Sequence, residues 1–154
     1  MPASLVEFRF GDYVISSDPA RIDLVEVHRA LSEGSYWARG RPFDVQATAV
    51  ANSLLVVGAS HDGDTQVGFA RMVTDVATFA WLADVYVLDE HRGDGLGTAM
   101  VRLIVEHPAV DEVRLHLLGT ADAHGLYARF GYTSLAEPER WMVRRRADPG
   151  RIEP

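Results

Sequence analysis

The chain has 154 residues, a formal net charge of −7 and no cysteine. Its length suits one domain, expected over residues 1–154, with a core large enough to fold without disulfide or metal support, and the lack of cysteine excludes thiolate metal sites and cysteine nucleophiles. The acidic balance argues against nucleic-acid binding, which needs a basic surface, and mildly favours a cationic partner such as an amine.

In the amino-terminal half, alternating polarity predicts strands and helical spacing of apolar residues predicts helices. The predicted elements, in chain order, are a broken strand or hairpin at 5–16, a helix at 18–34, a helix at 43–52, and strands at 53–60 and 65–74. The first helix has Asp18 as its N-cap and Pro19 in its first turn, and Gly34 ends it.

The carboxyl-terminal half is predicted to alternate strands with helices. The predicted elements are a strand at 78–88, a helix at 95–107, a strand at 113–118, a short helix around Tyr127 and a last strand at 141–145. Strands joined by short turns pair antiparallel, whereas the strand at 113–118 follows a helix and is expected to run parallel to the strand at 78–88. This order of elements predicts an α/β (α+β) fold on a mixed sheet.

A glycine-rich turn joins the strand at 78–88 directly to the following helix. Its three glycines, Gly93, Gly95 and Gly97, let the backbone take left-handed angles and let an anion approach the main chain closely. The first turn of a helix also has unpaired N–H groups and a partial positive charge. The junction therefore predicts a phosphate-binding loop, the alternative being a turn that only connects the two elements.

Residue types distinguish three kinds of phosphate loop. A P-loop is excluded because the chain contains no Gly-Lys pair. The dinucleotide fingerprint fits poorly, since its final glycine or alanine falls on Thr98 or Met100. The third pattern, Arg/Gln-x-x-Gly-x-Gly/Ala, is satisfied in full by Arg92, Gly95 and Gly97. With this pattern the segment resembles the acetyl-CoA loop of the GCN5-related N-acetyltransferases (GNAT).

Residues 122–132 resemble a second landmark of that family, a short helix that carries a tyrosine and closes in Phe-Gly-Phe/Tyr. Here the tyrosine is Tyr127 and the closing residues are Phe130, Gly131 and Tyr132. The order and spacing of the two blocks also match. The resemblance implies the GNAT fold, a twisted, mostly antiparallel mixed sheet of six to seven strands flanked by about four helices, in which a splayed pair of parallel strands holds the cofactor.

The resemblance implies acetyl-CoA as a co-substrate, bound without a metal. Backbone groups of the strand would bind the pantetheine arm, and N–H groups of the loop would bind the pyrophosphate with help from the Arg92 side chain and the Thr98 hydroxyl. The implied cofactor-binding residues are Val85, Tyr86 and Val87 in the strand and Arg92, Gly93, Asp94, Gly95, Leu96, Gly97 and Thr98 in the loop.

Acetyl transfer to an amine needs a deprotonated nitrogen and a proton for the departing thiolate. By its position in the family pattern, Tyr127 is the candidate acid. Asp84 is the leading candidate base, because a carboxylate within a strand is costly unless it is paired or used. Asp75 is the second candidate, and a chain of waters is the alternative to both. His124 lies one helical turn before Tyr127 and could join the site.

The loop at 35–42, between the first two helices, carries the candidate substrate-binding residues Tyr36 and Trp37. Large amphipathic side chains on a loop are typical of pockets and interfaces, although they could instead pack onto the core. The leading hypothesis is transfer of an acetyl group from CoA to a primary amine of a small molecule or peptide, by direct attack in a ternary complex. A non-catalytic acyl-CoA-binding or sensing module and transfer of another short acyl group stay open.

The sequence also bears on location and partners. It has neither a secretory signal nor a run near the roughly 18 apolar residues of a membrane span, so we expect a cytoplasmic protein without membrane or nucleic-acid partners. The segments SYWARGRP and FARMVTDVATFAWLADVYVLDEHRGDGLG resemble a subgroup of small bacterial acetyltransferases. Oligomeric state is open, and the strand expected at 141–145 offers an edge along which two copies could pair as a homodimer.

Overall fold

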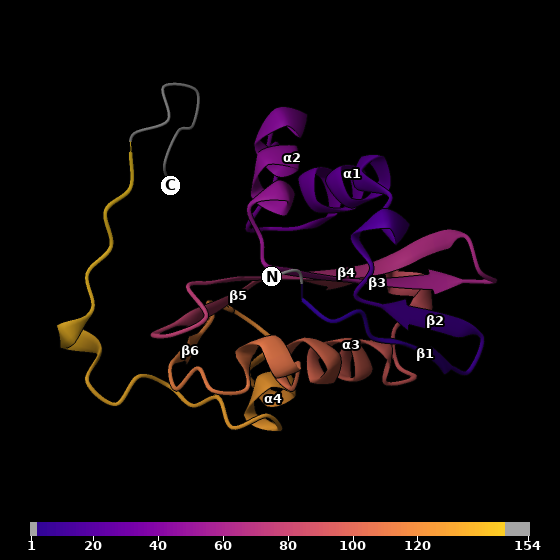
Figure 1. Ribbon diagram of the computed structural model, residues 1–154. Coiled ribbons are helices and arrows are strands. Elements are labelled where there is room, and N and C mark those ends of the chain that lie inside the picture. The colour runs from indigo at the N-terminus through magenta and orange to yellow at the C-terminus, as the bar shows by residue number, and fades with distance from the viewer. Residues whose placement is uncertain (1–2, 147–154) are drawn as a thin grey trace.

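Six strands lie side by side in chain order in the computed structural model, which describes residues 3–146 (Figure 1). The strands are β1 (Glu7–Phe10), β2 (Tyr13–Ser16), β3 (Leu55–His61), β4 (Thr65–Thr74), β5 (Ala80–Val87) and β6 (His116–Leu117). The helices are α1 (Leu24–Gly34), α2 (Phe43–Ala51), α3 (Leu96–Val105) and α4 (His124–Ala128). In Figure 1, α1 and α2 cover one face of the sheet, while α3 and α4 cover the other. The predicted fold class is confirmed.

The pairing of β5 with β6 differs from every other pairing in the sheet. Strands β1 to β5 form an antiparallel meander, as the short connecting turns predict. Strand β6 runs parallel to β5, with only Ala80 opposite His116 and Trp81 opposite Leu117. Beyond these two pairs the strands separate, so the rest of β5 has no ladder partner on this side.

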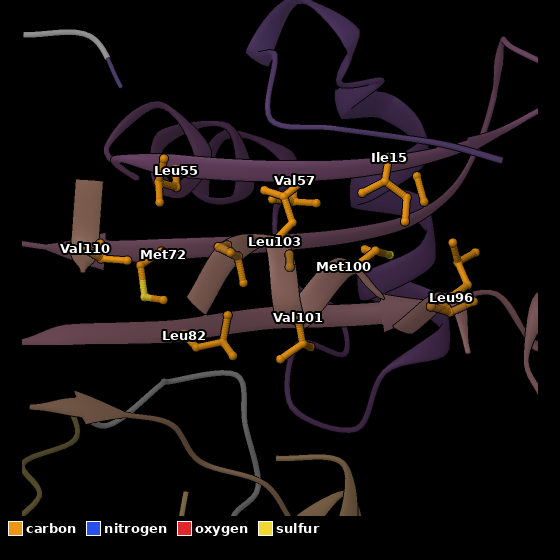
Figure 2. Close-up of a cluster of buried hydrophobic side chains, with 14 of the residues drawn as sticks. Ile15, Leu55, Val57, Met72, Leu82, Leu96, Met100, Val101, Leu103 and Val110 are labelled. Atoms are coloured by element: carbon orange, nitrogen blue, oxygen red, sulfur yellow. The ribbon is translucent and has the colours of Figure 1, made fainter. Parts of the chain in front are cut away.

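Helix α3 is held by a core face that the sequence spacing predicts. Leu96, Met100 and Ile104 are almost completely buried against β3 and β4, and Figure 2 shows the first two among the surrounding apolar side chains. Burying a side chain of this size contributes roughly 1.5–3 kcal/mol, more than helix propensity could supply. The contact with β4 is close, because a Cβ added at Gly68 would lie 2.7 Å from the Met100 sulfur.

The helix predicted at 18–34 is interrupted near its start. Asp18 caps only a 3₁₀ turn at Pro19–Arg21, and the chain then extends at Ile22. A second aspartate, Asp23, begins α1 by accepting a hydrogen bond from the N–H of Glu26 at 3.1 Å. Two capping residues five positions apart thus begin two separate elements. Within residues 3–146, no helix combines the length and apolarity needed to cross a bilayer.

The strand predicted at 141–145 is absent, and the one predicted at 113–118 is reduced to β6. Met142 is 98% exposed and Val143 is 75% exposed, and Figure 1 shows this segment running away from the sheet. Apolar, β-prone residues form a strand only where a neighbour pairs their backbone groups. Strand β6 is only two residues long, so it cannot pair with a five-residue strand at 141–145.

Candidate functional site

A cavity of about 760 Å³ lies where β5 and β6 separate. One wall is β5 from Trp81 to Val87, and the opposite side is the segment that follows β6, residues 118–123. The turn before α3 and the loop between α1 and α2 complete the lining. The separation of two parallel strands therefore creates the space, and loops from both halves of the chain surround it.

A β-bulge bends β5 in the middle of this wall. In the pairing with β4, Phe69 lies opposite Tyr86 and Arg71 lies opposite Ala83, so β5 has one residue more than β4 between these pairs. Within the bulge Asp84 has a φ of 53°, a left-handed conformation that is uncommon for a residue with a side chain. Bulges increase the local bend and twist of a strand, which helps β5 turn away from β6.

The amino terminus of α3 has the backbone features that could hold an anion. Gly93 and Gly95 have φ values of 100° and 85°, so both use the left-handed region that favours glycine. Gly95 is the N-cap of α3 and no side chain caps the helix, which leaves the N–H groups of its first turn without helical partners. A Cβ at Gly97 would meet only Val87, at an ordinary 3.6 Å. Gly97 also lines the cavity.

Two arginines stand near this helix terminus, only one of which the sequence pattern identified. The Nε of Arg92 donates to the carbonyl of Val87 at 2.8 Å, and its Nη1 lies 2.9 Å from Asp89. Arg129 also lines the cavity, with Nη1 at 3.5 Å from the Thr98 hydroxyl. Its position two residues after Tyr127 in the second motif block was the available signal. Asp94 belongs to the same turn but lies outside the cavity lining.

Tyr127 projects from α4 into the cavity. It is 8% exposed, and its ring meets that of Tyr132 edge-on with centroids 6.0 Å apart. Burial raises the pKa of Tyr127 to about 12, with smaller contributions from Tyr36 and Asp122. The phenol is therefore fully protonated at neutral pH and faces the same space as β5 and the glycine turn.

Asp84 is buried and bonded to residues from two other segments of the chain, the loop between α1 and α2 and strand β4. Its Oδ2 accepts from Nη1 of Arg41 and from Nε of Arg71, each at 2.7 Å, and its Oδ1 accepts from the indole N–H of Trp37 at 3.1 Å. Burial alone would raise the pKa of this carboxyl, but the hydrogen bonds and charges of the two arginines outweigh burial and lower it. Sequence reasoning did not single out either arginine as a partner of Asp84.

The loop between α1 and α2 covers the cavity. The Tyr36 hydroxyl accepts a hydrogen bond from the N–H of Ala121 at 2.8 Å, and the rings of Tyr36 and Trp37 meet edge-on at 5.0 Å. Both side chains line the cavity and remain partly exposed. The structure thus brings Tyr36, Trp37, Asp84 and Tyr127 together with the glycine turn in one space.

Two further candidates from the sequence lie elsewhere. Asp75 is in the turn between β4 and β5, where the Thr78 hydroxyl and the backbone N–H groups of residues 77–79 hold its pKa well below its ordinary value. His124 is exposed at the start of α4, outside the lining of this cavity. Neither is placed to act on a molecule in the cavity. Among the described residues, no group of three histidine or carboxylate side chains could hold a metal ion.

Comparison with known proteins agrees with this geometry. The acetyltransferase (GNAT) domain family matches residues 52–134. A presumed GNAT acetyltransferase of known crystal structure from Xanthomonas campestris pv. campestris is 40% identical, with a TM-score of 0.83, and the match covers 89% of this chain and 95% of that one. A presumed acetyltransferase of Gibberella zeae is 34% identical over 113 residues, so the match spans 62% of this chain and 64% of the fungal protein.

A more distant structure shares the fold alone. It is a predicted acetyltransferase from Clostridium acetobutylicum whose crystal structure was determined with acetyl-CoA; it is 16% identical with a TM-score of 0.61, and the match covers 86% of this chain and 94% of that one. The family match covers more than half of the present chain and includes both the glycine turn and Tyr127. The chain belongs to the GCN5-related N-acetyltransferase family.

Proposed function

We propose that the protein is an N-acetyltransferase that uses acetyl-CoA and acts on a primary amine of a small molecule or peptide. One observation carries the proposal: a single cavity runs from the uncapped amino terminus of α3, past the part of β5 that has left β6, to the hydroxyl-bearing ring of Tyr127. An anion site, unpaired strand backbone and a buried phenol are the parts needed to hold a phosphorylated carrier and assist acyl transfer.

The residues present fit acetyl-CoA. The first-turn N–H groups of α3, with Arg92 and Arg129 beside them, would hold the pyrophosphate. Backbone groups of Val85 to Val87 would pair with the pantetheine amides, because β6 no longer occupies them. When bound, acetyl-CoA supplies the acetyl group as an activated thioester.

The amine attacks directly in the ternary complex. A bond forms between its nitrogen and the acetyl carbon while the carbon–sulfur bond breaks, and the amine loses one proton. The pKa of about 12 at Tyr127 lies above that of a thiol, so we assign its hydroxyl the role of hydrogen-bond donor to the departing sulfur. Asp84 has a lowered pKa and two arginine partners, which suits positioning better than proton uptake. We therefore route the amine proton through cavity water to solvent.

The first test is binding followed by turnover. We expect acetyl-CoA and CoA to bind in calorimetry, and an amine panel to reveal at least one acceptor by acetyl-CoA-dependent thiol release. Absence of binding at millimolar acetyl-CoA would contradict the proposal. Binding without thiol release on any amine would favour a sensing module, and faster transfer from propionyl-CoA or succinyl-CoA would favour another acyl group.

A matched pair of glycine variants tests the phosphate loop itself. Gly95→Glu puts a side chain and a negative charge at the mouth of the anion site, and we expect it to abolish acetyl-CoA binding. Gly63→Glu is the control, because Gly63 has a nearly identical φ, 89° against 85°, but lies in the turn between β3 and β4. Both variants carry the same backbone strain, so equal melting temperatures with unequal binding would assign the loss to the site.

A further inference from the structure

The charge of the cavity is opposite to that of the chain. The sequence carries a net −7, yet the charged side chains that line the cavity are Arg41, Arg71, Arg92, Arg129, Asp84 and Asp122. Arg92 and Arg129 stand at the phosphate loop, where the donor substrate accounts for them. Arg41 and Arg71 stand elsewhere, and the phosphates give no reason for their presence.

Arg41 and Arg71 lie at the other end of the cavity, around the bulge. Arg71, on β4, lies opposite Ala83 of β5. Arg41 lies near the end of the loop that carries Tyr36 and Trp37. Their side chains are only 20% and 14% exposed, and both bond the same oxygen of Asp84. Two largely buried cations thus share one anion, which leaves an excess of one positive charge beside the acceptor loop.

The two guanidinium groups also have donors to spare. Nη1 of Arg41 donates hydrogen bonds to Asp84 and to the Gln46 side chain. Nε of Arg71 donates to Asp84, and its Nη1 donates to the Ser53 hydroxyl at 3.4 Å. Each guanidinium has five N–H donors. In the part of the chain that the structure describes, Nε and Nη2 of Arg41 and Nη2 of Arg71 have no acceptor.

An anchor for the bulge would need only one arginine. A single cation already neutralises the Asp84 carboxylate, and a second partly desolvated cation is unfavourable unless another anion joins it. One excess charge matches a monoanionic carboxylate better than a phosphate monoester, which carries close to two charges. Arginine also binds carboxylates through two parallel hydrogen bonds.

We propose that the acceptor is an amine that also carries a carboxylate, the chemistry of an amino acid, and that Arg41 and Arg71 bind this carboxylate while Asp84 holds them in place. This inference rests on the proposed transferase function and names its substrate class. The overall negative charge of the protein attracts cations at long range, whereas the local pair selects for a negative group on the acceptor.

The test compares each amino acid with its own amide, which removes the carboxylate charge and keeps the amine and side chain. We expect kcat/KM for the best amino acid to exceed that of its amide by about tenfold or more, which is the effect expected from losing one hydrogen bond between arginine and a charged carboxylate. Arg41→Gln and Arg71→Gln should each reduce this ratio toward one. Arg9→Gln, at an exposed arginine on β1, should leave it unchanged.

A binding measurement separates this inference from the proposed function. With CoA at saturation, calorimetry compares an N-acetylated amino acid with the corresponding N-acetyl amide, and the acid should bind about tenfold more tightly. If the acid binds preferentially but no amine is acetylated, the carboxylate site stands and the transferase proposal fails. If amines are acetylated but amides equal or exceed the acids in both assays, the transferase stands and this inference is overturned.

Discussion

The Tyr36 hydroxyl accepts a hydrogen bond from the N–H of Ala121 at 2.8 Å, although the two residues are 85 positions apart. This bond connects the loop between α1 and α2 to the segment that follows β6. It therefore spans the cavity on its acceptor side, and the geometry of the acceptor loop depends on a contact made late in the chain.

Removing that hydroxyl should loosen the loop without disturbing the donor site. We expect Tyr36→Phe to lower the free energy of unfolding by about 1 kcal/mol, the net value of an ordinary hydrogen bond, and to raise KM for the acceptor several-fold. The dissociation constant of acetyl-CoA should not change. Thr48→Val, which removes a hydroxyl bond within α2, is the control and should leave KM unaltered. An unchanged KM in Tyr36→Phe would show that the bond does not shape the acceptor loop.

Tyr127 should contribute to the chemical step and not to donor binding. We expect Tyr127→Phe to lower kcat for thiol release by about 10²-fold, because one hydrogen-bond donor to the departing sulfur is lost. Calorimetry should give the same affinity for acetyl-CoA. Tyr132→Phe is a matched control, since that hydroxyl is buried without a partner in residues 3–146 and its ring lies 6.0 Å from that of Tyr127. Full turnover in Tyr127→Phe would remove the tyrosine from the mechanism.

Alkaline pH should destabilise the protein through its buried tyrosines. Burial raises the pKa of Tyr127 and of Tyr132 from the ordinary 10 to about 12, so the folded state favours the neutral phenols. Their contribution is fully present below pH 10 and is lost as the pH rises through 12, because the unfolded chain ionises first. Urea unfolding at pH 8 to 11 should show this decline, and it should be shallower in Tyr127→Phe. Equal slopes in the two proteins would contradict the raised pKa.

Asp84 should matter more for stability than a surface aspartate of the same backbone conformation. We expect Asp84→Asn to lower the free energy of unfolding by about 3 kcal/mol, because two largely buried arginines lose the one anionic partner that they have within residues 3–146. Asp62→Asn is the control, since Asp62 has a φ of 50° against 53° but its side chain is exposed and lies 3.2 Å from His61. Adding Arg71→Gln to Asp84→Asn should recover part of the loss. No recovery would mean that excess charge is not the cause.

Local motifs could be predicted from the sequence, and contacts between distant segments could not. The glycine turn and Tyr127 each lie in one short block whose spacing is fixed by a strand, a turn and a helix, so the sequence could single them out, and the three glycines and Tyr127 all line the cavity. The cluster around Asp84 depends on a register shift between β4 and β5 and on the loop after α1. No periodicity in the sequence encodes that shift. The strand at 141–145 was wrong for the same reason, since pairing depends on a neighbour.

The two ends of the cavity come from different stretches of the chain. The match to the family begins at residue 52, whereas Tyr36, Trp37 and Arg41 all precede it. The family match therefore excludes the loop that carries these residues, although the loop bonds to Asp84 and Ala121, which lie within the match. A graft that exchanges residues 35–42 for the corresponding loop of a relative should redirect the choice of amine and leave the thioester partner as it is. Arg71 and Asp84 would stay unchanged in such a graft, so each new loop would have to make its contacts with this ion pair.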